Sequence, residues 1–139
     1  HARIGHFLAE VVDNSVSDPQ RRGCFLINSA IEVAPHDPEL GRVITEHLRE
    51  VRHFFERSLV AARAAGTVAP QIDCPQAADH LMAVLLGIRV LARTRPERKL
   101  LTGIVESALA PLGLTTAAEP ANERGGRKRD GRGPPSGRA

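Results

Sequence analysis

The chain has 139 residues, of which 42% are hydrophobic and only 3% aromatic, so it is long enough for about one domain with a core of its own. Four Phe without any Trp or Tyr argue against a protein that stacks nucleic-acid bases on aromatic side chains. The net charge of +3 lies entirely in residues 119–139, because residues 1–118 carry 13 basic and 13 acidic residues. The predicted folded part therefore has no net positive charge with which to attract DNA.

The remaining composition indicates a helical protein of the cytoplasm. With only 3% aromatic residues, the core has to be built from Leu, Val, Ile and Ala, which favours helices. Two Cys without a CxxC pair predict no disulfide framework and make a reducing cytoplasm the default location. The longest apolar run, residues 81–87, is far shorter than the roughly 20 residues that span a bilayer.

The first two predicted helices span about residues 2–15 and 22–34. The first has an apolar stripe at spacings of three and four, and because no capping residue precedes that stripe, we expect the chain to be a piece of a longer protein. The second is apolar on nearly every side, so we expect it to be buried all round, and Pro35 ends it. The stripe of the first helix consists of Ile4, Phe7, Leu8, Val11 and Val12.

The third predicted helix, about residues 38–65, has the clearest boundaries. Asp37 is a good N-cap, Pro38 suits the first helical position, and Gly66 is typical of a C-terminal cap. Its apolar residues recur at spacings of three and four on one side, with charged residues opposite.

The fourth and fifth predicted helices span about residues 75–93 and 97–112. The fourth has two apolar faces, and a lone domain of this size seldom needs both, so the second face predicts a partner subunit. The small residues Ala83 and Gly87 would let a neighbouring helix approach closely. We therefore expect a homodimer formed through these two helices, with an interface of Ala83, Gly87, Val90, Leu91, Leu101, Ile104, Val105 and Ala108.

Residues 119–139 differ from the rest of the chain. They contain five Gly, three Pro and nine charged residues and no large apolar side chain, so they cannot bury enough surface to offset the entropy of ordering. We predict a disordered basic tail.

The stretch GCFLINSAIEVAPHDPEL at residues 23–40 contains the residue types of a catalytic cysteine site. They are a thiol (Cys24), an amide (Asn28), an imidazole (His36) and a carboxylate (Asp37). If a helix separates Cys24 from His36, the two lie about 18 Å apart, whereas a nucleophile needs its base within about 3 Å. We therefore expect Cys24 to be a packing residue and Asp37 a helix cap. The sequence also contains no glycine-rich phosphate loop or nucleotide fingerprint, so we predict neither enzyme activity nor a cofactor.

Three polar residues interrupt apolar helix faces, and each has two interpretations. Asn28 either bonds to a backbone group or a neighbouring helix, or faces a ligand cavity. His47 is either a satisfied core histidine or a polar anchor for a ligand, and Arg89 either extends to solvent or pairs with an acid across an interface. No metal site is expected, because the six His never occur four residues apart and no Cys pair supports them.

Residues 22–112 resemble the C-terminal half of the TetR family of transcriptional regulators. The likeness is carried by RGCFLINSAIEVAPHDPELGRVI at 22–44, SLVAARAAGTV at 58–68 and LMAVLLGIRVLARTRPERKLLTGIVESALAPL at 81–112. The resemblance implies a five-helix, all-α bundle over residues 1–118 that binds an effector. It also implies that the last two helices form a four-helix bundle with the same pair from a second subunit.

The resemblance also implies a cavity among the earlier helices that takes a small, mostly apolar effector. The family's N-terminal helix-turn-helix is missing here, so DNA contact is expected only through that missing part. A purely structural helical interaction module without a ligand is the alternative, and a sealed core would favour it. The ligand-binding residues that we predict are Phe7, Val11, Cys24, Asn28, His47, Val51, Phe54 and Phe55.

Overall fold

The computed structural model describes residues 2–116, which form five α-helices and contain no strand. The predicted all-α fold is confirmed, whereas the predicted tail at 119–139 lies outside the described residues. A single 3₁₀ turn, Ala110–Leu112, extends the last helix. The helices are α1 (Ala2–Ser17), α2 (Phe25–Glu32), α3 (Pro38–Ala64), α4 (Cys74–Thr94) and α5 (Arg98–Leu109).

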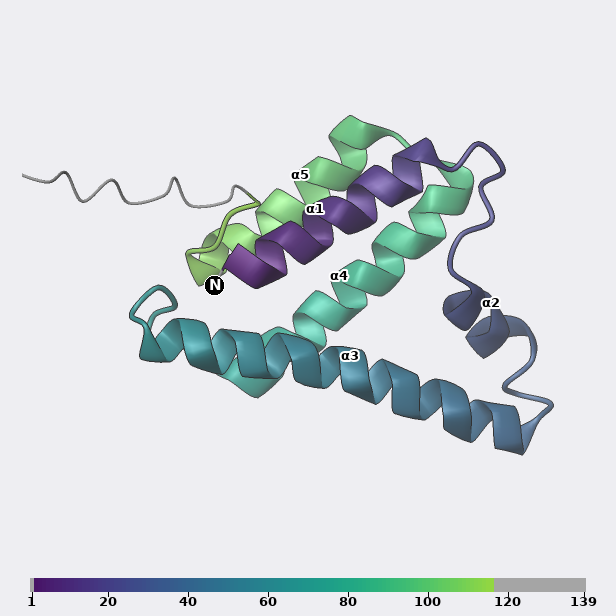
Figure 1. The fold of residues 1–139 in the computed structure, drawn as a ribbon, viewed down its shortest axis with the longest axis horizontal. Coiled ribbons are helices and arrows are strands. Elements are labelled where there is room, and N and C mark those ends of the chain that lie inside the picture. The colour runs from purple at the N-terminus through teal and green to yellow at the C-terminus, as the bar shows by residue number, and fades with distance from the viewer. Residues whose placement is uncertain (1, 117–139) are drawn as a thin grey trace, which may run out of the picture.

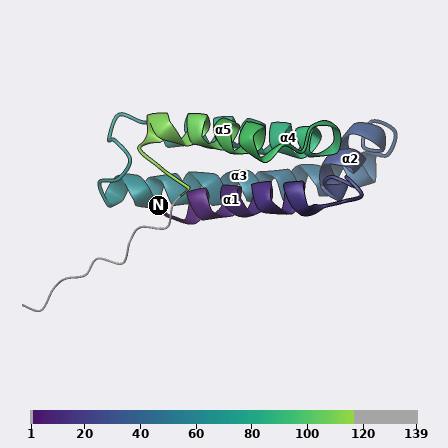
Figure 2. The same ribbon diagram turned by 90° about the horizontal axis from the view of Figure 1, so that it is seen from above.

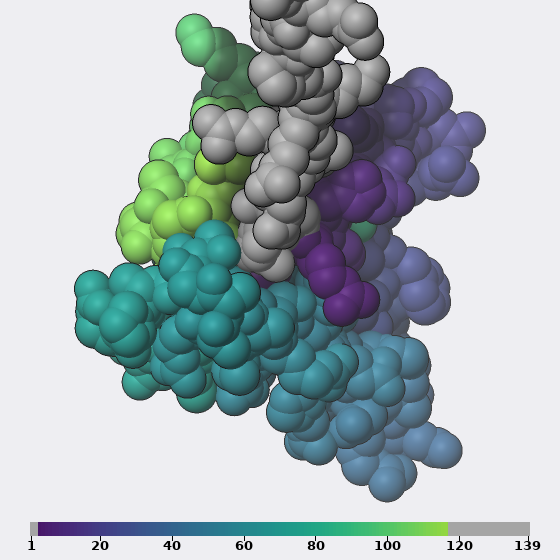
Figure 3. All heavy atoms as spheres, turned by 60° about the vertical axis from the view of Figure 1, so that its left-hand side comes forward, coloured from purple at the N-terminus to yellow at the C-terminus, as the bar shows by residue number. Residues whose placement is uncertain are grey.

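The helices form two layers, with α2 at one end (Figures 1 and 2). One layer consists of α4 and α5 and the other of α1 and α3, and α1 packs against both helices of the first layer. In the space-filling view the end of α3 and the loop to α4, in teal, lie below α5 and α1 (Figure 3). The α4–α5 layer is therefore covered by helices on one face only.

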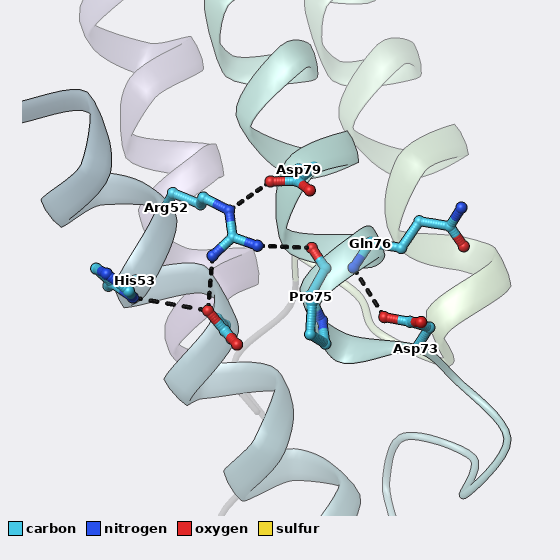
Figure 4. Close-up of polar contacts among 7 residues, drawn as sticks. Arg52, His53, Asp73, Pro75, Gln76 and Asp79 are labelled. Atoms are coloured by element: carbon cyan, nitrogen blue, oxygen red, sulfur yellow. Dashed lines mark hydrogen bonds and ion pairs between the residues drawn. The ribbon is translucent and has the colours of Figure 1, made fainter. Parts of the chain in front are cut away.

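The helix boundaries follow the local signals in the sequence. The side chain of Asp37 accepts hydrogen bonds from two backbone N–H groups of the first turn of α3, at 3.1 and 3.0 Å. Gly66 follows the end of α3 with a φ of +78°, which glycine adopts without strain. Asp73 caps α4 by accepting a hydrogen bond of 3.0 Å from the backbone N–H of Gln76 (Figure 4). The predicted cap of α3 is thus confirmed, and α4 begins with a cap of the same kind.

The core lies between the two layers and is built almost entirely from aliphatic side chains. Residues of α1, α3, α4 and α5 all contribute to one cluster, as expected of a single domain with one contiguous core. Its largest fully buried side chains are Phe55, Ile4, Leu8, Leu59, Leu81, Ile88, Leu101, Leu109, Val68 and Val105.

The prediction that the second helix is buried on all sides is wrong. In α2 only Ile27 and Ser29 are buried, while Phe25 and Ile31 are 83% and 64% exposed. The helix has only eight residues and lies at the end of the bundle, where it packs mainly against the beginning of α3. One side of it is therefore covered, and an apolar side is left in solvent.

The chain beyond α5 folds back over the first turns of α1. Gly113 turns the chain with a φ of +70°, and Leu114 is 5% exposed. The backbone of Thr115 then passes so close to Gly5 that a Cβ atom there would stand 1.9 Å from the Thr115 carbonyl oxygen. We call residues 113–116 the C-terminal strap, and its course requires glycine at position 5.

Candidate functional site

Three aromatic rings form a cluster between α1 and α3. The ring centroid of Phe7 is 5.3 Å from that of Phe54 and 5.8 Å from that of Phe55, and the latter two are 5.6 Å apart. Tilted rings at these distances stabilise one another by an amount that adds to the free energy of burying their apolar surface. Phe55 is fully buried, whereas Phe7, Phe54 and the adjacent Val51 are partly exposed. Four of the eight predicted ligand-binding residues thus lie together.

An open hollow of about 240 Å³ lies on this aromatic cluster, lined by Phe7, Glu50, Val51 and Phe54. Its wall is apolar except for Glu50, so it suits a small apolar group. Val11 lies in the core at 3% exposed, and therefore offers little surface to a ligand. The structure leaves this hollow as one candidate for the predicted effector site.

His47 does not lie in the core, so the interpretation as a core histidine is wrong. Its side chain is 58% exposed, and its Nδ1 lies 3.5 Å from a carboxylate oxygen of Glu50. The N-terminal half of α3 extends beyond α1 and α4 (Figure 1). The ring of His47 is therefore left in solvent, although Ile44 in the same half of α3 is 4% exposed.

Asn28 has two structural partners at the other end of the molecule. Its Nδ2 donates a hydrogen bond of 2.9 Å to the carbonyl of Arg22, and its Oδ1 accepts one of 3.1 Å from Nη1 of Arg93. The backbone of Gly23, with a φ of +69°, lies against the aliphatic part of Arg93. The first of its two interpretations, bonding to backbone and a neighbouring helix, is thus observed, and this bonding ties α2 to the end of α4. Asn28 also borders an open hollow between these two helices.

Replacing Asn28 with alanine is expected to loosen α2 without unfolding the domain. Each lost hydrogen bond is worth about 1 kcal/mol, so protection of α2 amides from hydrogen exchange should fall by about 5- to 30-fold. Hydrogen exchange measured by NMR tests this, with the exposed Asn14→Ala on α1 as the control. Equal loss of protection in α4 would contradict a local role.

A polar network holds α3 against the start of α4 (Figure 4). Arg52 donates to the carboxylate of Asp79, to Glu56 at 2.7 Å and to the carbonyl of Pro75 at 3.4 Å. The hydrogen bond to Asp79, followed by that to Glu56, raises the pKa of Arg52 above its ordinary value. His53 approaches the same Glu56 at 3.6 Å. These groups bond to one another across α3 and α4, so the network holds the two helices together.

Cys24 and His36 lie at opposite ends of α2, as predicted. Cys24 is the N-cap residue of the helix, and His36 is exposed in the turn beyond its end. Within residues 2–116, no three potential metal ligands gather at one place. Nor is any helix of this part long and apolar enough to cross a membrane.

The uncovered side of the α4–α5 layer carries a second apolar surface. An open hollow of about 760 Å³ lies on it, lined in part by Val84, Leu100 and Ile104. A Cβ atom built on Gly87 or Gly103 would meet nothing within 4 Å, so both glycines border open space. Helical spacing places on this side a set that we call the outer face: His80, Val84, Gly87 and Leu91 of α4, and Leu100, Gly103, Ile104 and Ser107 of α5.

The predicted dimer residues divide into exposed and buried positions. Gly87, Leu91 and Ile104 belong to the outer face, whereas the exposed Ala83 and Val90 lie beside it, and Val90 lines a hollow between α2 and α4.

By contrast, Leu101 and Val105 are fully buried in the chain's own core, and Ala108 is 6% exposed. They have almost no surface left for a partner, so we leave them out of the proposed interface. Sequence reasoning missed Val84, Leu100 and Gly103, although their spacing of three and four along each helix marks a second stripe.

The structure is a small all-helical domain in which α4 and α5 leave one face uncovered. It agrees with the all-α domain that the resemblance to the C-terminal half of TetR-family regulators implied. The family described as "Tetracyclin repressor-like, C-terminal domain" matches residues 1–108. The chain therefore belongs to the TetR family of transcriptional regulators, as a C-terminal domain of that family. The family predicted from the sequence is confirmed.

One relative is the uncharacterized HTH-type transcriptional regulator YezE of Bacillus subtilis (strain 168). It is 31% identical over 101 residues, which cover 71% of this chain and 52% of the relative. The chain thus spans about half the length of that relative. No solved structure matches the chain.

Proposed function

We propose that the chain is the ligand-sensing and dimerisation part of a TetR-like repressor, which acts in the cytoplasm and contacts DNA through another part of the full-length protein. Membership of the family supports this proposal, as does the relative that is named as an HTH-type regulator. The outer face is the observation that carries it. Within residues 2–116, nothing covers its apolar and small side chains.

A second copy of the same two helices fits the outer face best. In a twofold dimer the same patch occurs on both subunits, so it has to be complementary to itself. Gly87 and Gly103 permit close approach of helices, and Val84, Leu100 and Ile104 supply the apolar surface that such contact would bury. The result is a four-helix bundle of α4 and α5 from each subunit.

The sensing step in this proposal is a shift in helix positions. An effector that binds one arrangement of the helices more tightly than another shifts the population towards it. In a dimer, such a shift changes the distance between the two DNA-reading parts, which have to match the spacing of the operator half-sites. The effector is small and mostly apolar, and it occupies a hollow among the first four helices.

Replacing Gly87 with aspartate is expected to weaken the dimer by about 10- to 100-fold in dissociation constant. The substitution places one carboxylate from each subunit at the centre of the bundle, and like charges across an interface are unfavourable. The side chain meets open space in the single chain, so the fold should persist. Sedimentation equilibrium measures the dissociation constant, and circular dichroism checks the helices.

Ala61→Asp is the matched control, because Ala61 is exposed on α3, in the other layer. It should leave the dissociation constant within about twofold. A Gly87→Asp chain that remains helical and retains the dimer mass of the unaltered chain would contradict the proposed interface. So would a monomeric unaltered chain.

A further inference from the structure

A hollow of about 320 Å³ lies between α2 and the C-terminal part of α4. We propose that it binds an organic carboxylate with a short apolar chain. This inference rests on the proposed function, because it names the site and the chemical class of the effector. The residues that line the hollow are Ile27, Asn28, Ile31, Arg89, Val90, Arg93 and Thr94.

The charge of the lining selects an anion. Two guanidinium groups, of Arg89 and Arg93, border the hollow, and no acidic side chain does. Arg93 donates to Asn28 from Nη1 alone, and Arg89, which is partly buried, has no hydrogen-bond or ion-pair partner within residues 2–116. The planar guanidinium fork matches a carboxylate with two parallel hydrogen bonds. Arg89 is thus a cation on a largely apolar helix for which residues 2–116 provide no counter-ion.

The rest of the lining selects an apolar chain next to that anion. Ile27 is buried at the base of α2, while Ile31 and Val90 are 64% and 46% exposed. A hydrocarbon chain between these two would remove apolar surface from water, which is favourable. A volume of about 320 Å³ is at the small end for ligand pockets. The chemistry therefore fits a short amphipathic acid better than a large or highly charged ligand.

The position of the hollow provides a route from ligand to dimer. The hydrogen bond between Asn28 and Arg93 joins α2 to α4, and a carboxylate on Arg93 would compete with it or bridge it. On the same helix, Gly87 and Leu91 belong to the outer face. A ligand that changes the packing of α2 on α4 thus acts on a helix that also forms the proposed dimer interface. Regulation requires such a coupling between the ligand site and the interface.

The test uses octanoate as the probe and the full, ¹⁵N-labelled chain in an NMR titration. Octanoate should shift the amide signals of residues 27–31 and 89–94 in a saturable way. Arg89→Gln should weaken its binding at least tenfold, because it removes the free cation without removing a hydrogen bond of the fold. The control Arg57→Gln removes the same charge from an exposed site on α3 and should stay within twofold. The neutral 1-octanol should bind at least tenfold more weakly than octanoate.

Three results would overturn the inference. They are the absence of saturable shifts, equal weakening by the Arg89 and Arg57 substitutions, and shifts centred on Phe7, Val51 and Phe54. The last would move the effector to the aromatic hollow and leave a sensing role intact. Whether the chain forms the proposed dimer is tested separately, because sedimentation of the unaltered chain is measured without any ligand.

Discussion

Replacing Phe55 with alanine is expected to lower the free energy of unfolding by about 3–5 kcal/mol. Phe55 is fully buried and packs against two further rings, at centroid distances of 5.8 and 5.6 Å. Its removal loses apolar burial and leaves a cavity, because α1 and α3 are held apart by the rest of the core. A domain of this size has only about 5–15 kcal/mol in total, so the variant should be close to unfolding. Urea denaturation followed by circular dichroism measures the change.

Phe54→Ala provides the comparison within the same cluster. Phe54 has the same size but is partly exposed and lines the aromatic hollow. Less of its surface leaves water on folding, and its removal opens a groove to solvent instead of a closed cavity, so about half the cost is expected. If both substitutions cost the same, the assignment of Phe55 to the core and Phe54 to its edge would not hold.

Replacing Gly5 with alanine is expected to destabilise the protein by about 2–3 kcal/mol. The new Cβ atom would stand 1.9 Å from the carbonyl oxygen and 2.9 Å from the carbonyl carbon of Thr115. Both are backbone atoms, so the clash cannot be relieved by a side-chain rotation. The cost has an upper limit, since the C-terminal strap can detach from α1 and expose Leu114. Urea denaturation of the unaltered chain and of Gly5→Ala measures the difference in their free energies of unfolding.

A chain that ends at Leu114 distinguishes this clash from a general effect of the substitution. Without Thr115 the new methyl group has room, and alanine is a better helix former than glycine by up to about 1 kcal/mol. Gly5→Ala should therefore be neutral or slightly stabilising in the shortened chain. A loss of the same size in both chains would show that the strap is not the cause.

Local signals in the sequence were sufficient for the helices themselves. Asp37 caps the helix that it was predicted to cap, because a capping hydrogen bond involves only residues two or three positions away. Asp73 caps α4 in the same local way. Gly66 ends α3 for an equally local reason, its positive φ. Such features depend on short stretches of chain and need no knowledge of distant residues.

Burial could be predicted only in part, because periodicity shows which residues share a helix face and not what covers that face. α4 was predicted to have two apolar faces, and the structure buries one of them and leaves the other open. On α5, however, Leu101 and Val105 were placed on the open side, although they lie in the core. His47 was predicted to be either a core histidine or a polar anchor for a ligand, yet its side chain is exposed, because the N-terminal half of α3 extends beyond α1 and α4.

By itself, the sequence determined the all-α class, the five helices, the cap of α3 and the family, since these depend on local chemistry and on motif order. It did not determine the ends of α2, which was predicted over about residues 22–34 and spans Phe25–Glu32. The tertiary structure decided where the candidate sites lie. Asn28 and Arg93 are 65 residues apart in the chain, and Gly5 meets Thr115 from the opposite end of the described residues. Such contacts arise only when helices pack, because packing determines which faces meet and which remain free to bind something else.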